Sequence, residues 1–426
     1  MNPLPRPLPG RRPGMTLVEM LVATAMTLVI MGIVAQLFGM LGKGVTNSRS
    51  VMDLNAQIRS AAQTLRTDLA GITVDTLPPV APESDSGYLE VVEGPMNDTS
   101  KGTEQLTGDC DDIVMFTTRS FGEPFSGRYL RDSSTTVIHS PTAEVIWFCR
   151  PSPTAAQKVS GSKLYTLYRR QLLVMEYVGI PPFLGNGNSI AGTLPAKYLD
   201  YDLSLRREGS FLRPNSLGDL TKRENRFLHN VGGVVSKATF PFDVAGQIDE
   251  IDASTHVLNG QLTGTREGED IVITNVLAFD VRMFDPIAAI NGGSGEKGEY
   301  VDLGSAGGTR AAVGTTFPAT GLVPFTSRGV LVANAANHGV LKYPTYDTWS
   351  THYENNGLDE DQNGVVDDGI NGQDDNSNNV VDDPTERETS PPYPRALRGI
   401  EIRLRVYEPS SRQVRQVTVR HTFVPH

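Results

Sequence analysis

The chain has 426 residues and a mass of 46.2 kDa, enough for two or three ordinary domains or for one domain with long insertions. Its 42 glycines and 28 prolines exclude an all-helical bundle and a long helical repeat, and favour a largely β chain with many turns. The formal net charge of −11 argues against a nucleic-acid binder. The acidity is local, because residues 343–386 hold twelve acidic residues and no Lys or Arg, and the rest of the chain is close to neutral.

The N-terminal segment predicts a single membrane-spanning helix. Residues 1–14 are basic and proline-rich, and no charged residue occurs from Met20 to Gly42. A helix over this stretch is roughly 34 Å long, enough for the ~30 Å hydrocarbon core, and basic residues before it predict a cytoplasmic N-terminus with an exported C-terminal part. The run is too long for an ordinary secretory signal peptide, and no A-x-A-like cleavage site follows it. A plain signal anchor is the simpler alternative, but Glu19 at the membrane edge calls for a partner or a role, since a charge in the membrane costs about 2.5–3.5 kcal/mol.

The stretch GMTLVE at 14–19 resembles the processing site of type IV pilins and type II secretion pseudopilins. The resemblance implies that a membrane prepilin peptidase cuts between Gly14 and Met15, that the new N-terminus is methylated, and that Glu19 is the acidic fifth residue of the mature chain. Met15 stands where the family usually has Phe. In a stack of such subunits, Glu19 of one chain can pair with the Met15 amine of its neighbour, an attraction of about 4 kcal/mol before desolvation.

The helical pattern continues beyond the membrane segment. Apolar residues recur at steps of three and four from Val51 to Leu69, with polar residues, including Asp68, between them. We therefore expect one helix from about residue 16 to residue 70, whose membrane half covers 15–44 and whose amphipathic half covers 45–71. Pilin-like proteins share this plan.

An exported β-rich head is expected over 72–426. Segments rich in β-formers lie at 113–118, 144–149, 164–175 and 279–284, and two alternating segments at 400–407 and 417–423 predict a closing hairpin with one wet face. A helix followed by antiparallel strands gives an α+β fold. The order of these strands resembles minor pseudopilin J of type II secretion and the PilW-like minor pilins, although this chain is longer, with extra material around 179–262 and 286–394.

The two cysteines both fall in the predicted head. Cys110 lies at the start of one predicted strand and Cys149 at the end of another. Neighbouring antiparallel strands would bring them together, and an exported compartment permits a disulfide. Two buried free thiols are the alternative.

The acidic stretch contains a tandem repeat. Residues 359–368 (DEDQNGVVDD) and 374–383 (DDNSNNVVDD) match at six of ten positions. Alternating oxygen-bearing residues around a tight turn are typical of Ca²⁺ loops, and nine closely spaced acids would repel one another without a cation. Position 12 of an EF-hand is a bidentate Glu, but Ile370 and Thr385 stand there, so the loops instead resemble those of dockerin-like and thrombospondin-type repeats. A solvated, disordered acidic loop is the alternative. The expected calcium ligands are Asp359, Asp361, Asn363, the Val365 carbonyl, Asp367 and Asp368 in the first loop, and Asp374, Asn376, Asn378, the Val380 carbonyl, Asp382 and Asp383 in the second.

Catalytic motifs are missing from the sequence: there is no H-E-x-x-H, G-x-S-x-G or phosphate-loop pattern, and the seven histidines are scattered. We therefore expect no enzyme. The resemblance implies a structural subunit of a type II secretion or type IV pilus assembly, located in the inner membrane with a periplasmic head. Its expected partners are other pilin-like subunits, the prepilin peptidase and the inner-membrane assembly platform, and no nucleic acid. A pilus-tip adhesin and a membrane-anchored, calcium-binding exported protein, such as a hydrolase, are the competing classes.

Overall fold

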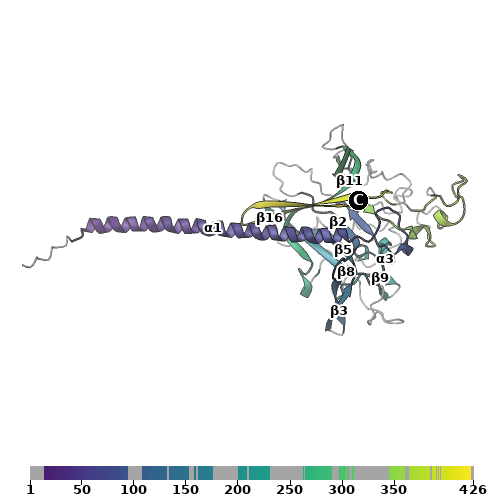
Figure 1. Ribbon diagram of the computed structural model, residues 1–426, viewed down its shortest axis with the longest axis horizontal. Helices are drawn as coiled ribbons and strands as arrows, with labels where there is room; N and C mark the ends of the chain where they lie inside the picture. The colour runs from purple at the N-terminus through teal and green to yellow at the C-terminus, as the bar shows by residue number, and fades with distance from the viewer. Residues whose placement is uncertain are drawn as a thin grey trace, which may run out of the picture. The chain divides into compact units, whose positions relative to one another are not determined.

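The computed structural model describes most of the chain (Figure 1). The described residues are 14–94, 108–131, 134–152, 158–159, 162–175, 200–208, 211–230, 262, 264–289, 297–303, 305–306, 309–310, 345–359, 364–383, 386–389, 391, 393 and 395–423. The chain divides into two compact units, which are described separately: residues 1–55 with 408–413, and residues 56–407 with 414–426.

One long helix and many strands make up the secondary structure. The helices are α1 (Leu17–Ala70), α3 (Leu217–Leu220) and α4 (Phe227–Asn230), with 3-10 turns η1 (Pro82–Ser84), η2 (Arg223–Asn225), η5 (Gly264–Arg266), η7 (Thr351–Glu354) and η8 (Asp368–Ile370). The strands are β1 (Leu89–Val92), β2 (Ile113–Arg119), β3 (Phe125–Arg131), β4 (Ser134–Ser140), β5 (Thr142–Pro151), β6 (Lys158–Val159), β7 (Ser162–Lys163), β8 (Tyr165–Leu173), β9 (Leu205–Glu208), β10 (Phe211–Pro214), β11 (Ile271–Ala289), β12 (Lys297–Val301), β13 (Ser305–Ala306), β14 (Thr309–Arg310), β15 (Thr345–Asp347), β16 (Gly399–Glu408) and β17 (Gln413–Thr422).

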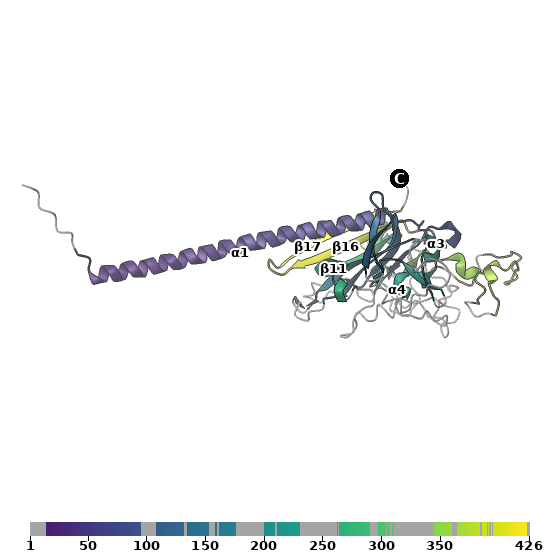
Figure 2. The same ribbon diagram turned by 90° about the horizontal axis from the view of Figure 1, so that it is seen from below.

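A nine-stranded sheet forms the centre of the second unit. Its order is β15-β1-β2-β5-β8-β11-β16-β17, with β12 also paired to β11, and Figure 2 shows β11, β16 and β17 side by side. The pairs from β15 to β16 in this order are antiparallel. The expected strands and the closing hairpin are confirmed, and with the single helix Leu17–Ala70 they confirm the α+β class.

The C-terminal part of α1 packs on one face of this sheet. Its apolar stripe is buried, from Ile58 to Leu69, as the periodicity predicts. The polarity of Asp68 suggested that it lies on the solvent-exposed side of the helix. It is instead buried, with only 3% of its surface exposed. Its carboxylate accepts bonds from Nε1 of Trp147 on β5 at 2.9 Å and from Nε and Nη2 of Arg169 on β8 at 2.7 and 2.8 Å. Burying an acid is tolerated here because a bidentate arginine and an indole donor satisfy it.

The opposite face of the sheet is covered by residues 201–227 and by the β3–β4 hairpin. Ile146 and Phe148 of β5 share a core there with Leu203, Leu220 and Phe227, among others. The sequence treated residues around 179–262 as extra material. The described part of this segment, within residues 200–230, supplies core side chains to the head.

Candidate functional site

The residues around the expected processing site begin the described chain. Gly14, Met15 and Thr16 precede α1, and the side chain of Met15 is 68% exposed. The backbone N–H and the hydroxyl of Thr16 donate to Oε2 of Glu19 at 2.9 and 3.0 Å, while the N–H of Glu19 donates to Oγ1 of Thr16 at 3.3 Å. This reciprocal pattern is a capping box, which places the carboxylate at the positive end of the helix. Glu19 therefore has a partner within its own chain, a role that the sequence analysis missed although Thr-x-x-Glu is its signature.

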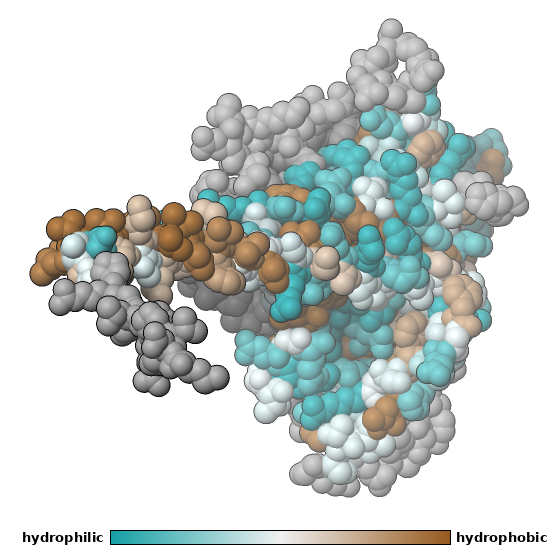
Figure 3. All heavy atoms as spheres, turned by 60° about the vertical axis from the view of Figure 1, so that its left-hand side comes forward, coloured by the Kyte–Doolittle hydropathy of each residue, from teal (hydrophilic) through white to brown (hydrophobic). Residues whose placement is uncertain are grey.

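The N-terminal part of α1 exposes a continuous apolar surface. Large apolar side chains from Leu17 to Val45 are 44–79% exposed, and Figure 3 shows them in brown along the helix. Among the described residues this helix alone is long and apolar enough to cross a membrane. A surface of this kind is stable only when lipid or other apolar helices cover it.

A buried acidic cluster lies where β2 begins. The carboxylates of Glu93, Asp109 and Asp112 each offer an oxygen within 4.8 Å of the others, and each residue is only 1% exposed. Burial, together with the neighbouring carboxylates, raises the pKa of both Asp109 and Asp112 well above the ordinary value. Three carboxylates held this close could hold a metal ion, because oxygen ligands suit hard cations.

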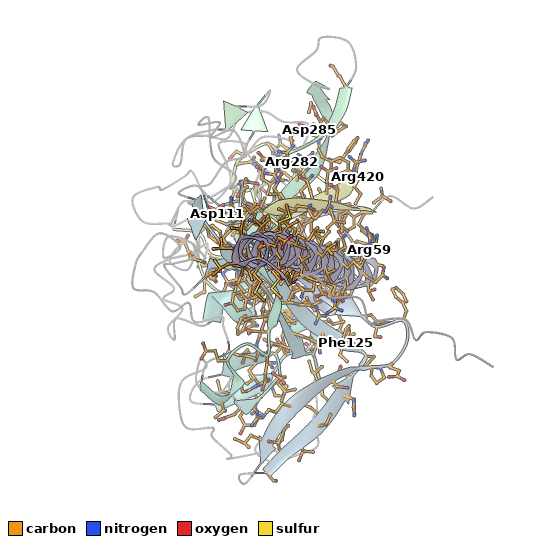
Figure 4. All side chains as sticks on the ribbon, turned by 90° about the vertical axis from the view of Figure 1, so that its left-hand side faces the viewer. Arg59, Asp111, Phe125, Arg282, Asp285 and Arg420 are labelled. Atoms are coloured by element: carbon orange, nitrogen blue, oxygen red, sulfur yellow. The ribbon has the colours of Figure 1, made fainter. Side chains whose placement is uncertain are left out.

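Backbone groups from three segments fix this cluster. Oδ1 of Asp112 accepts from the N–H of Gly94 at 3.1 Å, Oδ2 of Asp112 from the N–H of Val281 at 2.7 Å, and Oε2 of Glu93 from the N–H of Leu303 at 3.1 Å. Gly94 has to be glycine, because a Cβ there would lie 2.2 Å from the carboxyl carbon of Asp111. Figure 4 shows Asp111, a neighbour of the cluster in the sequence, apart from Phe125, so the cluster and the β3–β4 hairpin occupy different parts of the head. The sequence DCDD at 109–112 was the available signal, but nothing in it indicated that Glu93 lies nearby.

The acidic repeat folds into two loops with the same internal bonds, fifteen residues apart. Oδ2 of Asp359 accepts from the N–H of Gly364 at 3.0 Å, and Oδ2 of Asp374 accepts from the N–H of Asn379 at 2.7 Å. Gly364 and Asn379 both adopt positive φ angles, 94° and 69°. Asn379 fits this turn because asparagine tolerates the left-handed region.

The other ends of the two loops match in the same way. Oδ1 of Asp367 accepts from the N–H of Gly357 at 3.0 Å, and Oδ1 of Asp382 accepts from the N–H of Gly372 at 2.8 Å. The structural repeat is therefore longer than the ten residues that the sequence comparison aligned, since it begins at the preceding Asn-Gly pairs.

The structure describes the remaining predicted ligands of the second loop more fully than those of the first. In the second loop, Asn376 and Asn378 accept backbone N–H bonds within the loop, and Asp383 accepts from Nδ2 of Asn378. In the first loop, Asp368 is 5% exposed and starts η8, while Asp361 and Asn363 lie outside the described residues. The ligand role of the Val365 and Val380 carbonyls stays a prediction.

Three buried glutamates near the loops went unnoticed in the sequence. Glu354, Glu386 and Glu388 are 4%, 4% and 1% exposed. Oε1 and Oε2 of Glu354 accept from the N–H groups of Thr389 and Glu388 at 3.0 and 2.9 Å, and burial raises the pKa of Glu354 to about 7 despite these bonds. In the sequence Glu354 precedes the repeat and Glu386 and Glu388 follow it, and no pattern there predicts contact with it.

A second charged cluster joins the segment 223–229 to the sheet edge. Arg223 and Arg226 bind Glu90 of β1 at 2.7 and 2.6 Å, and both bind Asp347 of β15 at 2.9 and 3.0 Å. Nε2 of His229 lies 3.0 Å from Glu90, and all four Arg and acid side chains are fully buried. Because these acids and arginines satisfy one another, the cluster serves to hold the fold together.

The two cysteines are buried free thiols in the structure. Burial raises the pKa of both, and the nearby Cys149 adds to the shift at Cys110. Cys110 lies between Asp109 and Asp112 in the sequence, and Asp112 acts electrostatically on Cys149. The disulfide stays a prediction about the exported, oxidised protein.

No family model, no curated protein and no solved structure matches this chain.

Proposed function

We propose that the chain is a minor pilin-like structural subunit of a type II secretion or type IV pilus assembly. The observation that carries the proposal is α1 itself: an exposed apolar stretch that could span a membrane continues, within one helix, into a stretch packed on an antiparallel sheet. Such a helix gives each subunit both a membrane anchor and a surface for stacking against other helices.

Processing and assembly assign roles to the first residues. Prepilin peptidase would cut between Gly14 and Met15 and release an amine beside the Thr16–Glu19 capping box. Glu19 then exchanges its local bonds for the amine of a neighbouring subunit, or keeps both. The partners are other pilin-like subunits and the inner-membrane assembly platform, and the site of assembly is the inner membrane with the head exported. A bulky head at every step of a packed fibre would clash, so the subunit is present in low copy number.

Substitution at Glu19 tests the assembly role. Glu19→Val should still insert in the membrane and be processed, but should fail to enter fibres isolated by shearing. Thr16→Ala removes the two bonds that the Thr16 hydroxyl makes with Glu19 and leaves the carboxylate, so it is the matched control and should still assemble. Normal incorporation of Glu19→Val would rule out pairing, and equal failure of both variants would assign Glu19 to helix capping alone.

We further propose that the two acidic loops bind calcium. One observation favours a cation: Oδ1 of Asp359, the first predicted ligand, is shielded from solvent and has no hydrogen-bond partner among the described residues. A carboxylate oxygen in that state is costly unless a cation satisfies it. Asp359, Asp367 and Asp368 would hold the ion in the first loop, and Asp374, Asn376, Asn378 and Asp382 in the second. The bound ion would supply positive charge that lets the loops keep one conformation.

Isothermal titration of the full chain in detergent micelles tests this part. We expect calcium uptake at micromolar to millimolar concentrations. Asp359→Asn should remove one of two binding events, whereas Glu123→Gln, an exposed charge change elsewhere in the head, should remove none. A wild-type chain that takes up no calcium at millimolar levels would end the proposal.

A further inference from the structure

Two of the buried glutamates bond to different loops of the repeat. Oε1 of Glu388 accepts from the backbone N–H of Asp367 in the first loop at 2.6 Å. Glu386 bonds to the second loop, where Oε1 accepts from the N–H of Asn376 at 3.1 Å and Oε2 accepts from the N–H of Asp383 at 3.0 Å. The residues whose N–H groups are held are themselves predicted calcium ligands.

The two glutamates lie outside the loops, at the C-terminal side of the repeat. An EF-hand fixes its loop from within, through the acid at position 12, which both loops here lack. A carboxylate that accepts backbone N–H bonds at the ends of a loop fixes the same geometry without contacting the ion, in the way that outer partners orient metal ligands. We propose that Glu388 and Glu386 are positioning residues, one for each calcium loop; this rests on the calcium binding proposed above.

The charge balance around them supports this role. Both carboxylates are nearly fully buried, and burying an acid costs free energy unless other groups compensate. Residues 343–386 supply no Lys or Arg, so Arg387 is the first basic residue after the repeat. The two buried acids add to the negative charge of loops that already hold nine acids, and a cation bound at the loops would offset that charge.

Glu354 extends the arrangement toward the sheet on the side of the first loop. It accepts the N–H groups of Glu388 and Thr389 and the hydroxyl of Thr389, which in turn accepts from Nε1 of Trp349 at 3.1 Å. Glu354 therefore holds the segment that carries Glu388. It should act on the first loop through Glu388, and should have little effect on the second loop.

The experiment measures calcium affinity in chains that keep one loop each. Asp374→Asn leaves the first loop as the binding site, and Asp359→Asn leaves the second. In the first background, Glu388→Gln should weaken calcium binding by about 10- to 100-fold and Glu386→Gln by less than about threefold. In the second background the two effects should exchange. Glu83→Gln, an exposed charge change, is the control in both and should have no effect.

A double-mutant cycle in the first-loop background tests the part of Glu354. If Glu354 acts through Glu388, the double variant Glu354→Gln/Glu388→Gln should bind calcium with an affinity within about threefold of that of Glu388→Gln alone. Far-ultraviolet circular dichroism of each calcium-free variant confirms that it is folded.

The possible results separate the two proposals. A wild-type chain that binds no calcium overturns calcium binding itself, and the assignment of the glutamates with it. A wild-type chain that binds calcium at two sites, while Glu388→Gln and Glu386→Gln each affect both loops equally or match Glu83→Gln, overturns the assignment alone.

Discussion

The head handles dense negative charge in two different ways. At the edge of the sheet, Glu90 and Asp347 are fully buried, and each has arginine partners within about 3 Å from the same chain. In the acidic repeat, the carboxylates find backbone N–H groups and asparagine amides, and residues 343–386 offer no Lys or Arg. The first region carries its own counter-charge, so it needs nothing from solution. The second has no basic Lys or Arg side chain within its own stretch of sequence, and a bound cation would balance its acids.

The Glu93–Asp109–Asp112 cluster stands between these extremes. Its three acids are nearly as buried as the arginine cluster, and backbone N–H groups of Gly94, Val281 and Leu303 donate to Asp112 and Glu93. On the neighbouring strand β11, Arg282 binds Asp280 and Asp302 at 3.0 and 3.2 Å. Burial and the neighbouring carboxylates raise the pKa of both Asp109 and Asp112.

Removing an arginine from the balanced region should have the largest effect. Arg226→Met leaves Glu90 and Asp347 buried with less counter-charge, and should lower the free energy of unfolding by about 3–5 kcal/mol. Arg206→Met, which breaks a partly exposed pair with Asp219, is the matched control and should cost about 1 kcal/mol or less. Urea unfolding in detergent, followed by tryptophan fluorescence, measures both. A loss below 1 kcal/mol at Arg226 would contradict the view that this cluster holds the fold together.

Asp68 offers the same test at the helix. Asp68→Ala leaves Arg169 and Trp147 without their acceptor, and should cost about 2–3 kcal/mol. Hydrogen exchange in residues 56–70 should rise with it, because this bond network ties that stretch of α1 to the sheet. Arg66→Ala, an exposed change on the same helix, should leave exchange unchanged. Equal protection in both variants would show that apolar packing alone fixes the helix.

The pH dependence of the calcium-free chain tests the unbalanced region. The pKa of Glu354 rises from 4.5 to about 7 on folding, so its contribution is fully present below pH 4.5 and is lost as the pH rises through 7. The loss should be on the order of 3 kcal/mol, since each pKa unit of the shift is worth about 1.4 kcal/mol. Glu354→Gln should flatten this part of the profile when unfolding is followed in the presence of a chelator. An unchanged slope in the variant would assign the pH dependence to other groups.

Asp109→Asn should have the smallest effect and the opposite sign. Without metal, it removes one of three crowded carboxylates and should raise the free energy of unfolding by about 1 kcal/mol at pH 8. Asp280→Asn is the control, because it removes the negative charge of an acid that binds Arg282 and should therefore destabilise the chain. Both are measured by urea unfolding with chelator. Destabilisation by Asp109→Asn would show that the acid cluster is already balanced.

The sequence predicted the elements whose signal is periodic. The helix Leu17–Ala70 and the hairpin of β16 and β17 follow from apolar residues at steps of three and four and from strict alternation, and the structure confirms both. Periodicity also predicted the buried stripe of α1. It failed for Asp68, because the partner that makes its burial possible, Arg169, lies about one hundred residues away in the sequence.

The site was predicted where its residues are contiguous and missed where folding assembles it. The two acidic loops are visible in the sequence because their ligands follow one another. The pairing of β1 with β2 brings Glu93 close to Asp112, and Glu388 accepts a bond from Asp367, a residue 21 positions earlier in the sequence. The short strands β9 and β10 carry too few residues for a clear pattern, so the sequence did not predict them.

The most direct test of the proposed function is the mass of the N-terminal peptide of the protein isolated from its native cells. Cleavage between Gly14 and Met15 predicts a peptide that begins at Met15, carries one methyl group, and is replaced by the uncut form when the prepilin peptidase is inactivated. An intact Met1 N-terminus in cells with active peptidase, or a cut at any other position, would contradict the account.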